Sequence, residues 1–538
     1  MEKIWLKQYP PEVPPEIDSA RPPSLVQMLE ASFRAFAERP AFECLGKSLT
    51  YRELEGLSRQ VAAWLQARGI ERGAAVGLMM PNVLPYPVCI AALLRAGYTV
   101  VNINPLYTPR ELEHQLKDSG AVALFILDTF TPTLQKVQAN TAVRHVVTIG
   151  AGLPGTAPVL PDAVPFERVL AEAQALTFTP VPVAPDDIAF LQYTGGTTGV
   201  VKGAMLLHRN LVANLLQVKA WLQPALSKRP GQPLTFLCAL PLYHVYALNN
   251  CALLGMSLGA LNLLIPNPRD ITGLIQTLAG RPLHVLPGVN TFFNALVHHP
   301  DLGKLDLSHL LIATNGGAAA QRAVAEKWFA LTGVPLIDTY GLTEASPGVA
   351  SNPLTTPEFS GGIGLPLPST EVVLRDEDGQ EVPAGTPGEL CVRGPQVMGG
   401  YWKRPEETAR VMTSDGFSKT GDIAVADERG FLRIVDRKKD LILVSGFNVY
   451  PNEVEGVVAM HPGVLEVAVV GVPDERTGEA VKLFVVKKDP ALTEAQLLDF
   501  CGEQLTNYKR PRSVEFRAEL PKSNVGKILR RELRPSTV

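Results

Sequence analysis

Hydrophobic and polar positions follow two different periods over the first 150 residues. Short apolar runs at 74–80, 98–105 and 121–128 are separated by segments in which apolar residues recur every three or four positions. One such segment follows Thr50, an N-cap residue whose capping-box partner is Glu53. Because strands that alternate with helices form βαβ units, this pattern predicts a parallel sheet covered by helices on both faces.

The same alternation returns after residues 150–186, a region rich in Pro, Ala and Gly that we interpret as a connection. Apolar runs between 235 and 344 end in Gly or Pro turns and predict a second α/β unit. From Gly361 to Val435 the pattern is typical of strands joined by Gly-Pro turns, which predicts a small β-barrel. We therefore predict an α/β protein whose large N-terminal domain combines two sheet units with a barrel.

A cluster of charges at Asp436–Asp440 marks the next change of composition. Charge runs usually lie in solvent, and at a change of composition they are where an interdomain hinge is expected. Predicted strands and a helix follow this cluster and indicate a separate α+β unit. We predict that a second, smaller domain begins at this cluster.

Composition excludes several classes of protein. The 538 residues correspond to about three or four domain-sized units. With 46% hydrophobic and 19% charged residues, the chain is not largely disordered. Fifty basic residues balance 53 acidic ones, so no global field favours nucleic acid and none is expected as a partner. Six cysteines without a C-x-x-C pair, and a start without an apolar signal-peptide core, predict a cytoplasmic protein with reduced thiols.

One segment, Val245–Ile265, resembles a membrane span in its length and lack of charge. Three asparagines and two glycines interrupt it, and no asymmetry of Lys and Arg flanks it closely. We therefore predict a buried helix followed by a core strand.

The clearest chemical motif is YTGGTTGVVKG at Tyr193–Gly203, between a predicted strand and a predicted helix. Its glycines allow close approach of the backbone, its hydroxyls add donors, and Lys202 adds a positive charge, all of which suit a polyphosphate. The motif is not a Walker A loop, because Lys202 follows Val and precedes Gly. A flexible linker is the alternative, which the position between strand and helix disfavours.

This loop resembles the phosphate loop of the adenylate-forming enzymes, which include acyl-CoA synthetases, luciferases and peptide-synthetase adenylation domains. Those enzymes usually have Pro where this chain has Val201. Further blocks follow in the family's order: PLYH at 241–244, TNGGAA at 314–319, YGLTE at 340–344, KTGD at 419–422, DRKKDLILVSGFNVYPNEVE at 436–455 and PKSNVGKILRREL at 521–533. WLKQYPPEVPPEI and NPLYTPRELEHQL make the resemblance closest to bacterial long-chain fatty-acid–CoA ligases, over nearly the whole chain.

The resemblance implies ATP-dependent activation of long-chain fatty acids. Fatty acid and ATP would give acyl-AMP and pyrophosphate, and acyl-AMP would then acylate CoA with release of AMP. Joining two anions requires Mg²⁺ and a cationic side chain to neutralise their repulsion. The alternatives are a ligase of this fold for another acid or acceptor, and a non-catalytic lipid- or nucleotide-binding protein. The sequence leaves open the chain length of the acid, a homodimer, and peripheral contact with the inner membrane surface.

The resemblance also implies roles for single residues. Lys527 corresponds to the adenylation lysine, although by itself it is typical of a surface lysine in a basic tail. Glu344 and Thr194 would bind Mg²⁺, and Thr343 would contact the α-phosphate. His244 would lie where the acyl pocket meets ATP, although a lone histidine in an apolar setting is usually a core residue.

The remaining nucleotide contacts lie in the same blocks. Asp422 would accept hydrogen bonds from both ribose hydroxyls, Arg437 would contact the ribose, and Tyr340 would stack on adenine. The residues implied to bind ATP or AMP are Thr194, Gly195, Gly196, Thr197, Thr198, Gly199, Lys202, Gly316, Gly317, Asp338, Thr339, Tyr340, Gly341, Thr343, Asp422, Arg437, Lys439 and Lys527.

The turn Ser445, Gly446 and Phe447 would serve the second half-reaction. The resemblance implies domains at 1–438 and 439–538, the second being mobile. It also implies that this C-terminal domain rotates about the hinge residue Lys439, which withdraws Lys527 and brings the turn to the thiol of CoA. Under this hypothesis Gly446 lines the thiol channel, where any side chain would obstruct it. The alternative is that Gly446 is an ordinary turn glycine.

Overall fold

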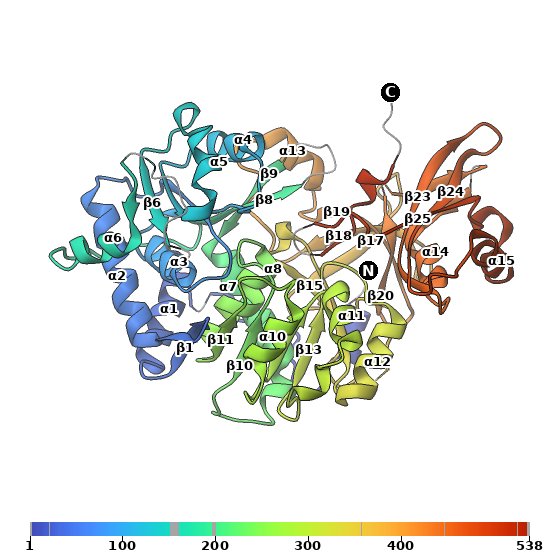
Figure 1. The fold of residues 1–538 in the computed structure, drawn as a ribbon, viewed down its shortest axis with the longest axis horizontal. Coiled ribbons are helices and arrows are strands. Elements are labelled where there is room, and N and C mark those ends of the chain that lie inside the picture. The colour runs from blue at the N-terminus through green and yellow to red at the C-terminus, as the bar shows by residue number, and fades with distance from the viewer. Residues whose placement is uncertain are drawn as a thin grey trace.

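Four β-sheets organise the chain, and Figure 1 shows the N-terminal elements in blue on one side and the C-terminal elements in red on the other. The structure is a computed structural model that describes residues 3–20, 22–150, 160, 162–195, 201–356, 358–438, 440–445, 447–523 and 526–534. The sheets have seven, nine, four and five strands. The protein is therefore α/β, with a large N-terminal part and a smaller C-terminal unit, as predicted.

The seven-stranded sheet contains the first predicted α/β unit. Its order is β7-β6-β5-β3-β4-β8-β9, and the neighbouring strands are parallel except β8 and β9. The predicted capping box of Thr50 and Glu53 is present at the start of α2. The strands are β3 (Ala75–Met79), β4 (Thr99–Asn102), β5 (Ala123–Leu127), β6 (His145–Ile149), β7 (Val164–Pro165), β8 (Ile188–Gly195) and β9 (Val201–Leu207). The helices are α2 (Tyr51–Ala67), α3 (Pro85–Arg95), α4 (Pro109–Ser119), α5 (Thr131–Gln135) and α6 (Phe166–Ala173).

The region 150–186 contains more structure than the sequence predicts. Strand β7 lies at the edge of the sheet, and α6 buries one face. Glu172 of α6 accepts a hydrogen bond from Trp64 Nε1 at 2.9 Å and pairs with Arg68 at 2.7 Å, both near the end of α2. The interpretation as a plain connection misses these elements, because the two-residue strand and the eight-residue helix are shorter than the stretch over which periodicity is read.

The nine-stranded sheet contains the second predicted α/β unit. Its order is β16-β15-β14-β13-β12-β10-β11-β1-β2, with a parallel centre from β14 to β1. The strands are β1 (Pro40–Cys44), β2 (Lys47–Thr50), β10 (Thr235–Cys238), β11 (Leu261–Leu264), β12 (Val285–Gly288), β13 (Ile312–Asn315), β14 (Leu336–Gly341), β15 (Gly348–Ser351) and β16 (Leu365–Pro366). The helices are α1 (Leu25–Ala35), α7 (His208–Leu226), α10 (Ile271–Leu278), α11 (Asn290–His298) and α12 (Arg322–Thr332).

The segment Val245–Ile265 is a buried helix followed by a core strand, as predicted. The helix consists of α8 (Val245–Ala247), a π-helical turn η4 (Leu248–Leu253) and α9 (Leu254–Ser257), and β11 follows it. In the part of the chain that the structure describes, no helix is long and apolar enough to cross a membrane.

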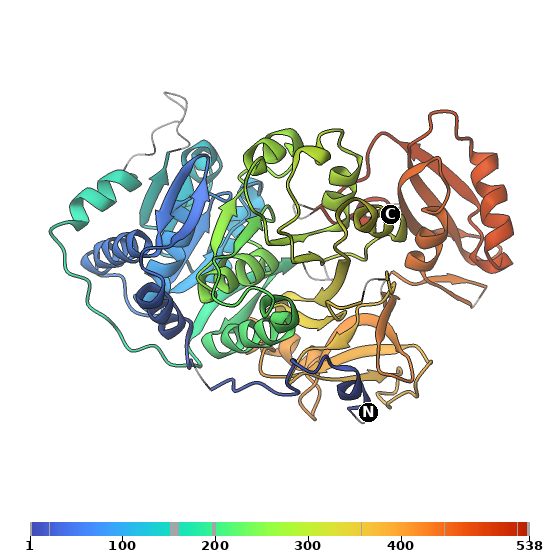
Figure 2. The same cartoon turned by 90° about the horizontal axis from the view of Figure 1, so that it is seen from below.

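The predicted barrel region forms a four-stranded antiparallel sheet, ordered β17-β18-β19-β20. Figure 2 shows the N-terminal segment running along this sheet, where Trp5 is buried. The backbone N–H of Ser369 donates to the carbonyl of Pro15 at 3.0 Å, so the first residues are part of this unit's packing. The elements are β17 (Glu371–Arg375), β18 (Gly388–Arg393), α13 (Pro405–Val411), β19 (Ser418–Ala426) and β20 (Leu432–Arg437).

The C-terminal unit is α+β, as predicted, and has its own apolar core. Its sheet has the order β22-β21-β24-β23, with β25 pairing in parallel with β24. The elements are β21 (Ile442–Val444), β22 (Phe447–Val449), α14 (Pro451–Val458), β23 (Val464–Asp474), β24 (Gly478–Lys487), α15 (Glu494–Gln504) and β25 (Ser513–Arg517). Its last segment, which carries Lys527, returns toward the large domain.

Candidate active site

A cavity of about 1770 Å³ lies where the ends of β12, β13 and β14 meet β8, β9, β19, β20 and the C-terminal segment. Motifs that are far apart in sequence meet here, and most of the predicted site residues line the cavity. They are Thr194, Lys202, His244, Gly316, Gly317, Asp338, Thr339, Tyr340, Gly341, Thr343, Glu344, Asp422, Arg437 and Lys527.

Other predicted residues lie elsewhere. Gly195 ends β8 and pairs with Val201, beside the cavity-lining Thr194. Ser445 and Phe447 are described but do not line the cavity, and Phe447 is 56% exposed and stacks on Tyr508 with ring centroids 4.8 Å apart. The predictions that fall outside the described residues are Gly196, Thr197, Thr198, Gly199, Lys439 and Gly446.

The Asp422 carboxylate is held by two partners from different sheets. Tyr340 Oη donates to Asp422 Oδ2 at 2.5 Å, and Arg437 Nε lies 3.1 Å from Oδ1. Asp422 and Arg437 face each other because they are paired residues of β19 and β20. Burial, together with the charge of Asp422, raises the pKa of Tyr340, so the phenol stays a donor. The result is an oriented carboxylate that can accept hydrogen bonds from vicinal hydroxyls.

Lys527 lies in a tight turn that docks on the large domain. Its backbone N–H donates to Ser523 Oγ at 3.1 Å, and the N–H of Ser523 donates to its carbonyl at 2.7 Å. The preceding Gly526 has φ of +78°, and a Cβ there would lie 2.5 Å from Thr291 Oγ1, which donates to the Gly526 carbonyl at 3.3 Å. Only glycine fits this contact, which places Lys527 at the cavity.

The ammonium group of Lys527 lies among other charged side chains and is partly shielded from solvent. Burial and the charge of Arg437 together lower its pKa to about 8, and the charge of Asp422 opposes both. Burial, with the charge of Lys527, lowers the pKa of His244 to about 4, so this histidine is neutral at pH 7. His244 Nδ1 also accepts the N–H of Tyr246 at 3.3 Å as the N-cap of α8. His244 thus combines a structural role with a place beside Lys527.

Glu344 lines the same cavity as Thr194 and Lys202 of the phosphate-loop strands. It lies on the 3₁₀ turn η6 (Thr343–Ala345), and its Oε1 accepts the hydroxyl of Tyr401 at 2.7 Å. Thr194 and Lys202 are paired residues of β8 and β9, and Lys202 lies 5.2 Å from the centroid of the Tyr401 ring. Mg²⁺ that arrives with a nucleotide needs only one or two protein oxygens, and Glu344 with Thr194 fits this requirement. Among the described residues, no group of three His, Cys, Asp or Glu side chains could bind a metal by itself.

A buried carboxamide, Asn315, and a buried carboxylate, Asp338, support the cavity wall that contains Gly316 and Gly317. Asn315 Nδ2 donates to Asp338 Oδ1 at 2.6 Å, and the N–H of Ala320 donates to the same oxygen at 3.2 Å. Burial raises the pKa of Asp338 to about 7, and these two hydrogen bonds oppose the shift. A Cβ on Gly316 would lie 2.9 Å from the ring of Tyr246, so the ring packs directly on the backbone at this point. Only glycine fits this contact.

Comparisons with known proteins agree with this geometry. Residues 29–402 match the AMP-binding enzyme family, and residues 453–527 match the AMP-binding enzyme C-terminal domain. The chain belongs to the AMP-binding enzyme family. The chain is 55% identical to a long-chain-fatty-acid–CoA ligase of Escherichia coli, with 99% of this chain and 98% of that protein covered.

Solved structures of this family have the same fold. ATP-bound MatB from Rhodopseudomonas palustris is 31% identical, with a TM-score of 0.83 over 95% of this chain and 98% of that one. The anthranilate CoA ligase AuaEII in complex with anthranoyl-AMP is 26% identical, with a TM-score of 0.85 over 97% of each chain. The fold class predicted from the sequence is thereby confirmed.

Sequence reasoning on this AMP-binding enzyme missed the partners of the predicted residues. Tyr401 orients Glu344, and Glu407 forms an ion pair with Lys202. Burial and the charge of Glu344 raise the pKa of Tyr401, so it donates throughout the neutral range. Tyr401 lies 57 residues from Glu344 in sequence, and Glu407 lies 205 residues from Lys202. Both partners are outside every motif, and no local signal points to them.

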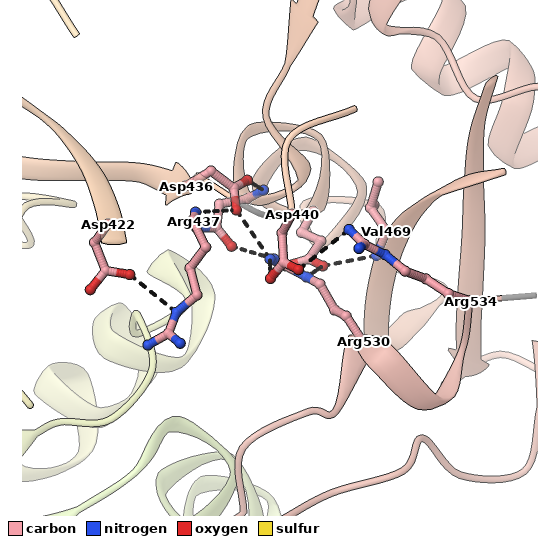
Figure 3. A network of polar contacts seen from close by, with 9 residues as sticks. Asp422, Asp436, Arg437, Asp440, Val469, Arg530 and Arg534 are labelled. Carbon is pink, nitrogen blue, oxygen red and sulfur yellow. Dashed lines mark hydrogen bonds and ion pairs between the residues drawn. The ribbon is translucent and has the colours of Figure 1, made fainter. Parts of the chain in front are cut away.

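A network of ion pairs holds the segment that carries Lys527 (Figure 3). Arg530 binds Glu455 through Nε at 2.9 Å and Nη2 at 2.6 Å, and its Nη1 lies 3.3 Å from Asp436 Oδ1 and 3.6 Å from Asp440 Oδ2. Asp436 is fully buried, which raises its pKa to about 6 although Arg530 opposes the shift. Because Asp436 belongs to β20, the network joins the C-terminal segment to the four-stranded sheet.

Proposed function

We propose that this AMP-binding enzyme is an AMP-forming long-chain fatty-acid–CoA ligase. It joins a fatty acid to ATP to give acyl-AMP and pyrophosphate, and then transfers the acyl group to CoA with release of AMP. The observation that carries the proposal is the convergence of Lys527, Asp422 and Glu344 on one cavity whose lining also includes apolar side chains. The similarity to long-chain-fatty-acid–CoA ligases over nearly the full length supports the choice of acid.

In the first half-reaction the protein must hold the nucleotide and reduce the repulsion between two anions. Asp422 and Arg437 would bind the ribose hydroxyls, and Tyr340 with the Gly316 wall would enclose the adenine. Thr343 and the strand pair carrying Lys202 would contact the phosphates. Bound Mg²⁺ would neutralise phosphate charge, held by Glu344 and Thr194.

Lys527 would stabilise the charge that develops on the α-phosphate during acyl transfer. A pKa of about 8 keeps the side chain cationic at pH 7, and its burial makes the interaction with an anion stronger than it would be in water. His244, neutral beside it, would lie where the acyl chain meets the nucleotide.

The second half-reaction would need another orientation of the C-terminal domain. In this structure Lys527 lines the cavity, whereas Ser445 and Phe447 do not. This supports the proposal that the present arrangement serves adenylation. We place the domains at 1–438 and 439–538, with Lys439 as the hinge, and rotation would bring the Ser445, Gly446 and Phe447 turn to the thiol of CoA.

A ligase of the same fold for another acid or acceptor is the competing function, and the related AuaEII is an anthranilate CoA ligase. The deciding experiment measures pyrophosphate release and thioester formation over acids of two to eighteen carbons, with and without CoA. Long-chain acids with CoA should give the highest kcat/KM. A preference for aromatic or short acids, or pyrophosphate release without a CoA thioester, would refute the proposal.

We further propose that the enzyme is cytoplasmic and binds its water-insoluble substrate at the inner membrane surface, because long-chain acids partition into bilayers. We also propose that it assembles as a homodimer. Flotation with vesicles that contain oleate tests membrane association, and sedimentation tests the assembly. Protein that stays at the bottom of the gradient, or sediments as a monomer, would contradict the respective proposal.

A further inference from the structure

Lys202 lines the cavity, and the proposed function assigns it to the phosphates of ATP. In this structure its ammonium group forms an ion pair with Oε2 of Glu407. The side chains of Lys202 and Glu407 are 13% and 22% exposed, so the pair is largely shielded from water. Such a pair is stronger than one at the open surface. A phosphate group that approaches Lys202 therefore competes with this carboxylate.

The backbone places Glu407 beside Lys202. Hydrogen bonds of 2.8 or 2.9 Å join residues 399–402 to residues 203–205 of β9, directly after Lys202. Helix α13 begins three residues after this paired segment, and its first turn contains Glu407. The proximity of the two side chains therefore does not depend on the ion pair alone, and Glu407 stays near Lys202 when the pair is broken.

A second cation binds Glu407 through its other oxygen. Arg410 Nη1 pairs with Oε1 of Glu407, and Arg410 also lines the cavity. The hydrogen bond from Lys202, together with the charges of Lys202 and Arg410, holds the pKa of Glu407 below its usual range although partial burial opposes the shift. The carboxylate is therefore ionised at neutral pH. When Lys202 moves to a phosphate group, Arg410 keeps this negative charge close to the cavity.

The carboxylates of Glu407 and Glu344 occupy different positions around Tyr401. Glu344 accepts the hydroxyl of Tyr401 at 2.7 Å, whereas Lys202 Nζ lies 5.2 Å from the centroid of its ring. Burial raises the pKa of Tyr401, and the charges of both carboxylates contribute to the shift. Glu344 lines the cavity, but Glu407 is described and does not. Glu407 can therefore act on a ligand through Lys202 and not by direct contact.

We infer that Glu407 is a positioning residue that gives up Lys202 to the β- and γ-phosphates of ATP and takes it back when pyrophosphate leaves. This inference rests on the proposed function, which assigns Lys527 and Thr343 to the α-phosphate and so leaves Lys202 for the phosphates beyond it. The charge of Glu407 competes with polyphosphate for Lys202 and lowers its affinity. AMP has neither of the outer phosphates, so its affinity is independent of Glu407.

The test is calorimetric titration of ATP, pyrophosphate and AMP, each with Mg²⁺, into the wild type and Glu407→Gln. The variant loses the charge and nearly keeps the shape of the side chain. It should bind ATP and pyrophosphate about three- to tenfold more tightly and AMP as the wild type does. Glu406→Gln is the matched control, because Glu406 is the exposed preceding residue of the same helix. It should leave all three affinities unaltered.

A double-mutant cycle shows whether Glu407 acts through Lys202. In the background of Lys202→Met, Glu407→Gln should lose most of its effect on pyrophosphate affinity, because the group for which it competes is absent. An effect of the same size in both backgrounds would contradict the inference. Unaltered binding of AMP also shows that each variant is folded.

The other outcomes are equally decisive. Weaker binding of ATP and pyrophosphate by Glu407→Gln would mean that the pair orients Lys202 toward the phosphates, and unchanged binding would mean that the two do not compete. An equal gain in Glu406→Gln, or for AMP, would show a general effect of charge. Each of these results overturns the inference. A wild type that binds ATP but forms no acyl-CoA from any fatty acid would refute the proposed function instead, and the pyrophosphate affinities would still decide the role of Glu407.

Discussion

Replacing Lys527 with methionine removes one positive charge from the cavity while keeping the length and apolar stem of the side chain. If Lys527 stabilises the charge on the α-phosphate, pyrophosphate release should slow by 10²–10³, or about 3–4 kcal/mol of transition-state stabilisation. Acyl-CoA formation from preformed acyl-AMP should persist, because that step does not use the lysine. Lys522→Met is the matched control, since Lys522 is in the same segment but pairs with Glu466 at 2.6 Å.

The same substitution should stabilise the ligand-free protein. The pKa of Lys527 falls from 10.5 to about 8 on burial. A shift of this size corresponds to about 3 kcal/mol of destabilisation while the lysine is charged. Because the folded protein binds this proton more weakly than the unfolded chain, the destabilisation is present in full below about pH 8. It decreases to about 1.5 kcal/mol near pH 9.5 and disappears above the ordinary pKa of lysine. Rotation of Lys527 into water would reduce these values, so they are upper limits.

Two measurements check this reasoning. Single-turnover assays follow pyrophosphate release from fatty acid and ATP, and thioester formation from acyl-AMP. Urea unfolding compares the wild type with Lys527→Met at pH 7 and pH 9.5, and the stability gain of the variant should be smaller at the higher pH. An unchanged rate of pyrophosphate release would remove Lys527 from the mechanism. Equal free energies of unfolding for wild type and variant at both pH values would refute the claim that the buried charge of Lys527 destabilises the folded protein.

Three further variants test other parts of the site. Glu344→Gln should raise the Mg²⁺ concentration needed for half-maximal pyrophosphate release about tenfold, and an unchanged Mg²⁺ titration would contradict its role. Asp422→Ala should weaken ATP and AMP alike by about 1.5–3 kcal/mol in calorimetry, since the ribose is common to both; a lower kcat with both affinities intact would exclude this. Gly446→Leu should let acyl-AMP accumulate while acyl-CoA formation is lost, whereas equal loss of both products with a lower Tm would indicate an ordinary turn glycine.

Much of the fold could be predicted because buried strands and amphipathic helices have distinct periods. The runs that became β3, β5 and β12 are short, apolar and bounded by turn residues. The placement of β1 and β2 beside β11 could not be predicted, because this pairing depends on contacts more than 200 residues apart in sequence. The π-helical turn could not be predicted either, because its asparagines weaken a helix without indicating which backbone hydrogen bonds replace the α-helical ones.

For the candidate site too, some residues could be predicted from the sequence and others could not. Residues whose chemistry requires a local pattern, such as the glycines near Gly316 and the turn before Lys527, were visible as motifs. Residues that act on those motifs from a distance, such as Tyr401 and Arg530, were not. A single sequence does not indicate a hydrogen bond between distant residues, because a tyrosine or arginine can be bonded either to water or to a buried carboxylate.

Strand β20 has a consequence for the order of events in the catalytic cycle. Its neighbouring residues Asp436 and Arg437 face different partners, Arg530 of the C-terminal segment and Asp422 of the nucleotide cavity. A nucleotide that reorients Arg437 therefore acts on the strand that holds Arg530. By thermodynamic linkage, the factor by which AMP favours one domain orientation equals the factor by which that orientation favours AMP. Product release and domain rotation would then form one coupled equilibrium, and weakening the Arg530 pairs would change how long AMP stays bound.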